Sequence, residues 1–353
     1  MEKLKVVDLF SGCGGFSYGF EQEEYEIILG VDNWSSALDT FRYNHKNSET
    51  LNLDLHDRDS ISLIEKHLGN EKIDVLIAGP PCQGFSLTGT RNINDERNSL
   101  FESVFNLSRK IDPKVLVIEN VQGILTLYNG ETKNKIIEEA ELLGYNVSYQ
   151  TIYAPDYGIP QIRKRVFFVM SKYPGFEFPK KTFKVENYVT SGDAIGDLHD
   201  FRNNDYGSEE SEYELSPSSL YQRNMRKSSN KLFNHVGTKH KDHVIEVIKQ
   251  VPEGGNHKDL PKGVGDSRKF NEAWTRYDRD KPSKTIDTGH RNHFHYEFNR
   301  VPTVRENARL QSFPDTFKFL GTKTDQNRQV GNAVPPILGQ EIAKSISSHL
   351  EKQ

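Results

Sequence analysis

The sequence predicts an α/β protein whose larger part is a doubly wound, mostly parallel β-sheet and whose smaller part is inserted into it. Apolar runs with the length of buried strands alternate with amphipathic segments that favour helices, a pattern typical of parallel sheets. The strands are expected at 5–10, 27–31, 73–78 and 114–118, and the helices at 35–45, 60–68 and 99–110. A change in composition near Phe183 marks the start of the smaller part.

The bulk composition indicates a soluble globular protein of one large and one smaller domain. Of the 353 residues, 35% are hydrophobic and 27% are charged, and no apolar run is long enough to span a membrane. The N-terminus leads directly into a strand and does not resemble a signal peptide. With two cysteines there is no disulfide framework, which favours a reducing compartment. We therefore expect a cytoplasmic protein.

The charge is distributed unevenly along the chain. The net charge is −4, but 19 of the 46 Lys and Arg residues and 11 of the 50 Asp and Glu residues fall within 221–310. That stretch carries +8 and the remainder −12. Such asymmetry predicts a surface that faces a polyanion, although an evenly solvated surface is the alternative.

Cys82 is the first candidate for chemistry. It follows the strand predicted at 73–78 and the stop signal Gly79-Pro80-Pro81, so it lies where ligand sites form in open α/β sheets. The two prolines fix φ and present the thiol on stiff backbone. A lone cysteine is usually a small buried side chain, but this one lies in a polar, glycine-rich loop and is a candidate nucleophile.

Three further strand ends carry polar or glycine-rich residues. The turn at 11–16 lets the backbone approach a ligand at the start of a helix. Asp32 ends the second strand and can accept hydrogen bonds from the ribose hydroxyls of a nucleoside, while Trp34 can stack on its base. Glu119 ends a buried strand, where a carboxylate is costly without a partner or a catalytic role.

The segment 79–86, Gly-Pro-Pro-Cys-Gln-Gly-Phe-Ser, resembles the nucleophile motif of the C5-cytosine DNA methyltransferases. Amino-group methyltransferases carry a related motif without cysteine. Further family motifs follow in order, so the resemblance to the bacterial restriction–modification type covers nearly the whole chain. The matching segments lie at 8–15, 119–121, 161–165, 279–286, 303–314 and 329–336.

The resemblance implies a Rossmann-like class I S-adenosylmethionine-dependent methyltransferase. A catalytic, cofactor-binding domain is expected at 1–183 plus 324–353, and a target-recognition, DNA-binding domain at 184–323. The implied activity is that of a sequence-specific DNA (cytosine-5-)-methyltransferase. It flips cytosine out of the duplex, adds the Cys82 thiolate to C6 and transfers the methyl group to C5.

The resemblance also assigns residues. A protonated Glu119 would hydrogen-bond N3 of the cytosine and Arg163 would hold O2, with Arg165 beside it on the same face. We expect no metal. The expected contacts to S-adenosylmethionine are Phe10, Ser11, Gly12, Cys13, Gly14, Gly15, Phe16, Asp32, Asn33, Trp34, Asp54, Leu55, Pro80, Asn332, Ala333 and Val334. The expected contacts to DNA are Gln83, Ser86, Arg91 and Thr285.

The expected partner is double-stranded DNA, with a separately acting restriction endonuclease as a further candidate. The enzyme is expected to be a monomer of the bacterial cytoplasm with no membrane partner. Three alternatives remain open: a tRNA cytosine-5 methyltransferase, a catalytically silent DNA-binding homologue and a dinucleotide-dependent oxidoreductase. The tRNA branch carries a Cys-Phe-Thr element, which is absent here because the only cysteines are Cys13 and Cys82.

Overall fold

The computed structural model describes residues 3–57, 59–81, 99–201, 205–264, 273–289 and 292–353. The chain divides into two compact units. The first, here called the sheet unit, comprises Met1–Tyr153, Lys164–Lys180 and Pro336–Gln353. The second, here called the inserted unit, comprises Ala154–Arg163 and Lys181–Pro335.

The unit boundaries differ in detail from the domain division expected from the sequence. Segments 154–163 and 324–335 belong to the inserted unit, whereas the sequence-based division assigned both to the catalytic domain. The assignment of a catalytic and a recognition role to the two parts stays a prediction.

The sheet unit is built on a seven-stranded sheet in the order β3-β2-β1-β4-β5-β7-β6. Strands β1 to β5 pair in parallel, and β7 pairs antiparallel with both β5 and β6. The strands are β1 Lys5–Leu9, β2 Glu26–Asp32, β3 Glu49–Asn52, β4 Val75–Ala78, β5 Val115–Val121, β6 Asn146–Tyr153 and β7 Lys164–Ser171. The chain order reverses between β1 and β4, so the carboxyl ends of these neighbours flank the point where open α/β sheets bind ligands.

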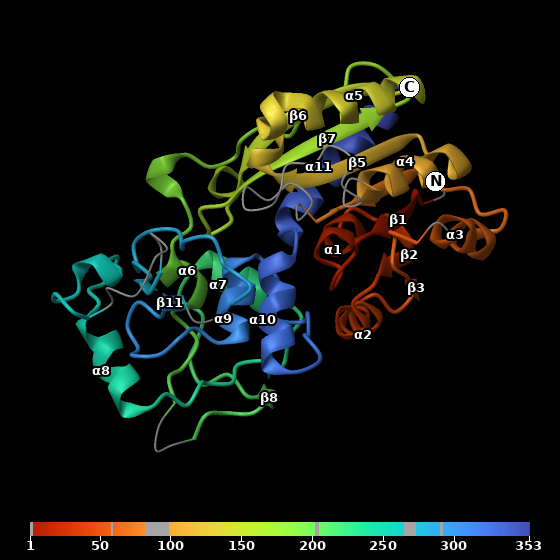
Figure 1. Ribbon diagram of the computed structural model, residues 1–353. Helices are drawn as coiled ribbons and strands as arrows, with labels where there is room; N and C mark the ends of the chain where they lie inside the picture. The colour runs from red at the N-terminus through yellow and green to blue at the C-terminus, as the bar shows by residue number, and fades with distance from the viewer. Residues whose placement is uncertain (1–2, 58, 82–98, 202–204, 265–272, 290–291) are drawn as a thin grey trace. The chain divides into compact units, whose positions relative to one another are not determined.

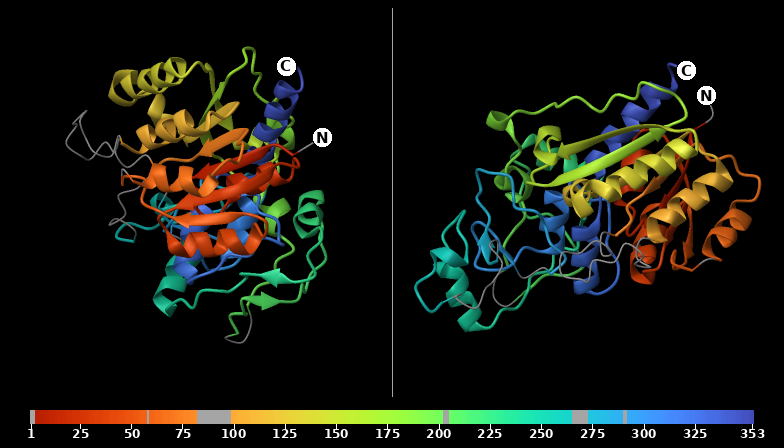
Figure 2. Two further views of the ribbon diagram at one scale, coloured as in Figure 1. Left: turned by 90° about the vertical axis from the view of Figure 1, so that its right-hand side faces the viewer. Right: turned by 45° about the horizontal axis from the view of Figure 1, so that its top comes forward.

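Helices cover both faces of the sheet (Figures 1 and 2). One face packs against α3, α4 and α5. On the other, Phe16 of α1 meets Phe167 of β7, and α1 packs against α11. This doubly wound arrangement confirms the predicted α/β fold. The helices of this unit are α1 Gly15–Glu21, α2 Ser35–Asn44, α3 Ser60–Leu68, α4 Ser99–Ile111, α5 Glu131–Leu142 and α11 Pro336–Leu350.

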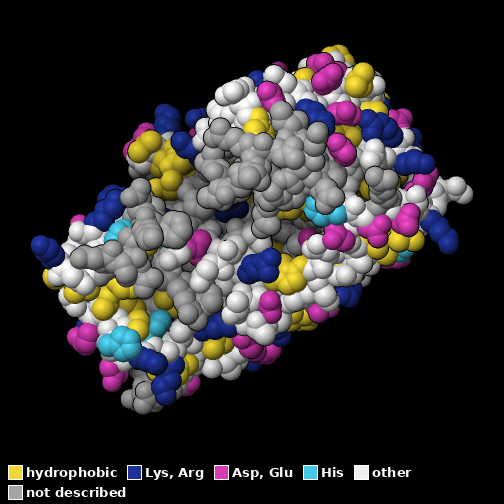
Figure 3. All heavy atoms as spheres, in the orientation of Figure 1, with side chains coloured by type: hydrophobic (Ala, Val, Ile, Leu, Met, Phe, Trp, Pro, Cys, Tyr) yellow, Lys and Arg dark blue, Asp and Glu magenta, His cyan; other side chains and the backbone are white. Residues whose placement is uncertain are grey.

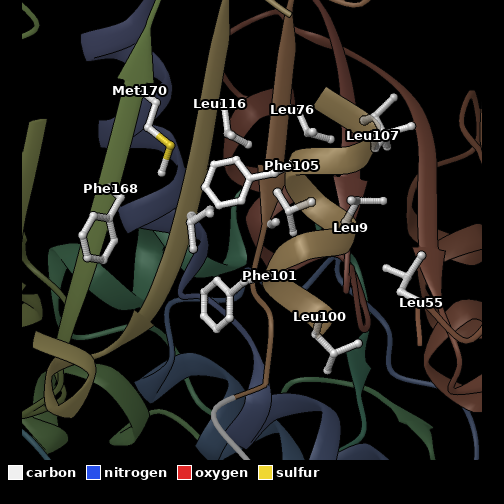
Figure 4. Packing of buried hydrophobic residues seen from close by; sticks show 14 of the residues in the cluster. Leu9, Leu55, Leu76, Leu100, Phe101, Phe105, Leu107, Leu116, Phe168 and Met170 are labelled. Atoms are coloured by element: carbon white, nitrogen blue, oxygen red, sulfur yellow. The ribbon is translucent and has the colours of Figure 1, made fainter. Parts of the chain in front are cut away.

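The core under α4 follows from the helical period of about 3.6 residues and from the alternation of side chains along a strand. Phe101 and Phe105 lie one helical turn apart and pack toward the sheet, where Leu116 and Leu76 project from neighbouring strands (Figure 4). All four side chains are at most 7% exposed. Burying each large apolar side chain stabilises the fold by about 1.5–3 kcal/mol, so this layer holds the strand ends in fixed positions.

The inserted unit has little regular structure. Two short sheets pair β8 Glu210–Ser211 with β9 Leu232–Phe233, and β10 Thr275–Arg276 with β11 His293–Phe294. Its helices are α6 Ser191–Ile195, α7 Leu220–Arg226, α8 Asp242–Gln250, α9 Val304–Leu310 and α10 Lys323–Asn332. Helix α9 begins with a capping box, in which Thr303 accepts from the Glu306 amide and Glu306 accepts from the Thr303 amide.

Buried arginines form an ion-pair network around α9, in addition to the buried aromatic cluster of Phe313, Phe317 and Phe319. Arg309 makes a bidentate pair with Asp315, with nitrogen–oxygen distances of 2.9 and 2.8 Å, and also donates to Asp197. Arg300 pairs with Glu306 at 2.7 Å through two nitrogens. Burial raises the pKa of Asp315, but the Arg309 guanidinium outweighs it and the pKa lies below its usual value. These ions are paired because an unpaired buried charge is costly.

Because of this network, the net positive charge counted at 221–310 is not all at the protein surface. Arg276, Arg300, Arg305 and Arg309 belong to the basic stretch at 221–310 and are all buried, so they add little positive charge to its surface. Segment 191–220 carries eight acidic residues, yet Asp197 within it is only 3% exposed. Among the described side chains on the face drawn in Figure 3, basic and acidic groups are interspersed.

Within the described part of the chain, none of the helices combines the length and the apolar character that crossing a bilayer needs.

Candidate active site

The segment after β4 is held in place by β5. Pro80 is buried, and its carbonyl accepts a 2.9 Å hydrogen bond from Asn120 Nδ2. The Gly79 amide donates to Leu9 O of the neighbouring strand β1 at 3.2 Å. The start of the Gly-Pro-Pro-Cys turn is therefore anchored on both sides. The predicted nucleophile Cys82 and the predicted DNA contacts Gln83, Ser86 and Arg91 lie outside the described residues.

Glu119 lies near the end of β5 and is buried. Its Oε1 pairs with Arg165 Nε at 3.0 Å. The β5–β7 register explains this pair, because Glu119 lies opposite Phe167 and Arg165 lies two residues further along β7, on the same face of the sheet. Glu119 Oε2 is 3.8 Å from the point that a β-carbon on Gly79 would occupy. The carboxyl group thus lies beside the turn that carries Cys82.

Arg163, the other predicted arginine, belongs to the inserted unit. Its guanidinium is buried, and Nη2 donates to Ala333 O at 3.1 Å and to Gly331 O at 3.4 Å. The structure places Arg165 on the Glu119 carboxylate. The expectation that Arg163 holds the cytosine O2 stays a prediction from the sequence.

The glycine-rich turn after β1 has the backbone of a ligand-binding loop. Phe10, Gly12 and Gly14 have φ values of 58°, 53° and 91°, in the left-handed region that favours glycine. A β-carbon on Gly14 would lie 2.2 Å from the His45 ring, whereas one on Gly12 would have no neighbour within 4 Å. The loop is thus packed on one side at Gly14 and open at Gly12, where a ligand could approach the backbone.

Asp32 joins this loop to the end of β2. Its two carboxylate oxygens accept from the Gly12 amide and the Trp34 amide, both at 2.8 Å. The side chain is half-buried, Trp34 is also half-buried and Asn33 is exposed. Each carboxylate oxygen can accept more than one hydrogen bond. Asp32 and the open loop therefore fit the ribose and the adjoining groups of a nucleoside cofactor.

The other residues expected to contact the cofactor differ in exposure. Asp54, after β3, is exposed and accepts from the His56 amide at 3.0 Å. Leu55 is buried, and Ser103 Oγ donates to its carbonyl at 2.5 Å. Phe16 is buried edge-on against Phe20.

Cys13 is also buried, and burial raises the pKa of its thiol to about 12, so it packs as a small apolar side chain. Its neighbours Ser11 and Gly15 are buried as well.

The predicted sites of the inserted unit lie at α10 and in the segment before β11. Asn332 is exposed at the end of α10, Ala333 is half-buried and Val334 is buried. Thr285 is exposed, and its hydroxyl donates to Ile162 O at 2.5 Å. This last contact links the expected DNA-binding element to the segment that carries Arg163. No group of three or more potential ligands among the described residues is placed to hold a metal ion.

Two residues with clear roles in this geometry were not assigned from the sequence. Asn120 fastens the Pro80 carbonyl. Asp8, in β1, is 1% exposed and accepts from Ser17 Oγ of α1 at 2.6 Å. Burial raises the pKa of Asp8 to about 8, with Ser17 opposing the shift and Asp32 adding to it. The available signal for Asp8 was a lone acid within an apolar strand directly before the glycine-rich turn.

A doubly wound sheet whose first strand ends in a glycine-rich turn and whose second ends in an acid defines a nucleoside-binding α/β enzyme. Residues 4–348 match the family described as C-5 cytosine-specific DNA methylase. The chain belongs to this family. It is a DNA cytosine-5 methyltransferase, as the sequence predicted, and this implies S-adenosylmethionine as the methyl donor.

Two Type II methyltransferases are similar in sequence to this chain over almost its whole length. Type II methyltransferase M1.HphI of Haemophilus parahaemolyticus is 38% identical over 351 residues, covering 97% of this chain and 86% of that protein. Type II methyltransferase M.DdeI of Desulfomicrobium norvegicum is 35% identical over 376 residues, covering 99% and 89%.

Solved structures agree with the fold. A protein assigned as a DNA modification methyltransferase, encoded within an E. coli prophage, has a TM-score of 0.82 at 27% identity and covers 99% of this chain and 100% of its own. The S. pombe Dnmt2 methyltransferase, at 17% identity, a TM-score of 0.59 and 99% coverage of both chains, shows the shared fold alone.

Proposed function

We propose that this protein is a sequence-specific DNA methyltransferase of the restriction–modification type, with Cys82 as its nucleophile. The observation that supports the catalytic part is the 3.0 Å ion pair between the half-buried Arg165 and the buried Glu119, whose carboxyl group lies beside Gly79. The similarity to two proteins named Type II methyltransferases supports the restriction–modification part.

The chemistry needs a nucleophile and an acid on opposite sides of the cytosine ring. Cytosine C5 is unreactive toward a methyl sulfonium until the Cys82 thiolate forms a bond to C6, which turns the ring into an enamine. Negative charge then gathers at N3 and O2. A protonated Glu119 donates a hydrogen bond to N3, and Arg163 holds O2, while Arg165 fixes the orientation of Glu119.

The second half of the reaction restores the aromatic ring. S-Adenosylmethionine, when bound, would supply an electrophilic methyl group to C5, and the broken sulfur–methyl bond would leave S-adenosylhomocysteine. A base then removes the C5 proton, the electron pair re-forms the C5–C6 double bond, and the Cys82 thiolate leaves. Cys82 thereby returns to the thiolate form in which it began, and the C5 proton stays with the base.

The cofactor is proposed to lie against the glycine-rich turn. Asp32 accepts its ribose hydroxyls and Trp34 stacks on its adenine, while Asp54 accepts from the adenine amino group. The remaining contacts come from Phe10–Phe16 backbone groups, Asn33, Leu55, Pro80 and the segment Asn332-Ala333-Val334.

The substrate is proposed to be double-stranded DNA, from which the target cytosine is rotated out of the stack. The inserted unit supplies phosphate contacts and base recognition, with Thr285 near the bases and Gln83, Ser86 and Arg91 contributing from the loop after Cys82. The enzyme acts as a monomer in the bacterial cytoplasm, alongside a separately acting restriction endonuclease.

The test replaces each cysteine in turn. Wild-type protein should form a covalent adduct with DNA that contains 5-fluorocytosine, because fluorine at C5 blocks the elimination that releases Cys82. Cys82→Ala should form no adduct yet still bind DNA and cofactor. Cys13→Ala, which removes the other thiol, should still form the adduct because that side chain is buried. An adduct that persists in Cys82→Ala would refute the assignment of the nucleophile.

A further inference from the structure

A chain of buried amide groups runs through the inserted unit. The Ile286 amide donates to Gln161 Oε1 at 3.2 Å. Gln161 Nε2 donates to Gln311 Oε1 and to Leu310 O, and Gln311 Nε2 donates to Ala333 O at 2.6 Å. Gln161 and Gln311 have no exposed surface. The same Ala333 carbonyl accepts from Arg163 Nη2 at 3.1 Å, so the chain ends on the predicted catalytic arginine.

Direct backbone contacts join the same segments a second time. Gly331 packs so closely on 287–288 that a β-carbon there would lie 2.6 Å from Asp287 O. The Ser283 amide donates to Pro160 O at 2.9 Å, and the Ile162 amide donates to Ser283 O at 2.7 Å. Segment 283–287 is therefore fixed to both 160–163 and 331–333, independently of the glutamine side chains.

The joined segments belong to three different parts of the proposed function. Segment 283–287 includes Thr285, proposed to lie near the DNA bases. Segment 161–163 carries Arg163, and segment 331–333 is proposed to border the cofactor. Directional amide groups, which accept one geometry, join the segments at this site. Each of these buried hydrogen bonds is costly to break, because a buried donor or acceptor without a partner costs about 1–3 kcal/mol.

We propose that Gln161 and Gln311 are positioning residues that couple base recognition by segment 283–287 to the placement of Arg163 and Ala333. This inference rests on the proposed function. When an incorrect base shifts segment 283–287, the shift is passed through the amides to the groups that serve methyl transfer. Discrimination between DNA sequences then appears in the rate of the reaction as well as in binding.

The experiment compares two duplexes. Bisulfite sequencing of plasmid DNA from cells that express the wild type first identifies the methylated motif. Duplexes with this motif, and with single-base changes in it, are then assayed for methyl transfer from labelled S-adenosylmethionine. The measured quantity is the ratio of kcat/KM for the correct and the changed duplex.

Three variants disturb the link in different ways. Gln311→Glu removes the donor to Ala333 O, Gln161→Glu removes the donors to Leu310 and Gln311, and Gly331→Ala inserts a methyl group against Asp287 without removing a polar group. We expect each to lower the discrimination ratio about tenfold or more, the effect of losing roughly 1.4 kcal/mol of selectivity.

Gln222→Glu is the matched control. Gln222 is equally buried in the inserted unit and donates to Gly192 O at 3.1 Å, away from the amide chain. Its substitution should lower thermal stability but leave the discrimination ratio within about twofold of wild type.

The outcomes separate this inference from the proposed function. If the wild type methylates a fixed motif and all three variants slow both duplexes by one common factor, the glutamines are merely structural and the inference is overturned. If the wild type methylates no fixed motif, the proposed function fails and the inference falls with it. A selective loss of discrimination in the three variants, absent in Gln222→Glu, supports the coupling.

Discussion

At the scale of single residues, Arg165 holds the Glu119 carboxylate through a contact of 3.0 Å between Nε and Oε1. A carboxylate at the end of an apolar strand, as Glu119 is in the sequence, is costly without such a partner. Its pairing with Arg165 depends on the antiparallel register of β7 against β5, which brings residues 46 positions apart in the chain into contact. No local pattern encodes that register, so the sequence favoured Arg163 for the cytosine and left Arg165 without a partner.

Arg165→Ala should lower kcat about 100-fold, equivalent to about 2.7 kcal/mol, because Glu119 loses the cation that orients it against the base. Single-turnover methylation of DNA would measure this loss. Arg109→Ala is the control, since Arg109 makes a partly exposed pair with Glu139 at 2.6 Å on the same unit. A kcat for Arg165→Ala equal to that of the control would remove Arg165 from the site.

Asp8 predicts a pH dependence of stability. Burial raises its pKa to about 8, against the ordinary aspartate value of 3.8, so the unfolded chain releases this proton at lower pH than the folded protein does. The stability that Asp8 contributes is complete below the unfolded pKa and is lost as the pH rises toward about 8.

Between about pH 5 and about pH 8, the free energy of unfolding should therefore fall more steeply for wild type than for Asp8→Asn, which cannot ionise, by up to about 1.4 kcal/mol per pH unit. Urea unfolding at several pH values would compare the slopes. Asp39→Asn, at an exposed position of α2, should keep the wild-type slope. Parallel curves for wild type and Asp8→Asn would show that Asp8 is already ionised in the folded protein.

At the scale of elements, β1, β2, β4 and β5 followed from apolar runs in the sequence. Helix α9 lies within the segment 303–314 that resembles a family motif, and it begins with a Thr-x-x-Glu capping box. The partners of α9 could not be predicted in this way. Asp197 comes from an acidic segment that resembles exposed surface in the sequence, yet it pairs with Arg309 of α9 across 112 positions. Charge counts along a sequence treat paired and solvated ions alike.

Arg309→Met should lower the free energy of unfolding by about 3–5 kcal/mol, because Asp315 and Asp197 would remain buried with too few cations beside them. Chemical unfolding followed by circular dichroism would measure it. Lys249→Met removes an exposed ion pair with Glu246 in α8 and should change stability by less than about 0.5 kcal/mol. Similar effects from both variants would mean that the Arg309 network is not a major source of stability.

At the scale of the whole molecule, the sequence predicted the mostly parallel sheet and the loops at its carboxyl edge, because strand ends are marked by glycine, proline and charged residues. It could not predict that 154–163 and 324–335 group with the inserted unit, since that depends on long-range contacts such as Arg163 with Ala333. It also overestimated the exposed positive charge at 221–310, where four arginines are buried.

The central claim is that this enzyme methylates cytosine C5 within one fixed DNA sequence. Bisulfite sequencing of plasmid DNA and of tRNA from the same cells, expressing either wild type or Cys82→Ala, tests it most directly. In wild-type cells a single short DNA motif should be protected from conversion. This protection should be absent with Cys82→Ala, and tRNA should be unchanged. Protection of one tRNA position without any protected DNA motif would contradict the claim.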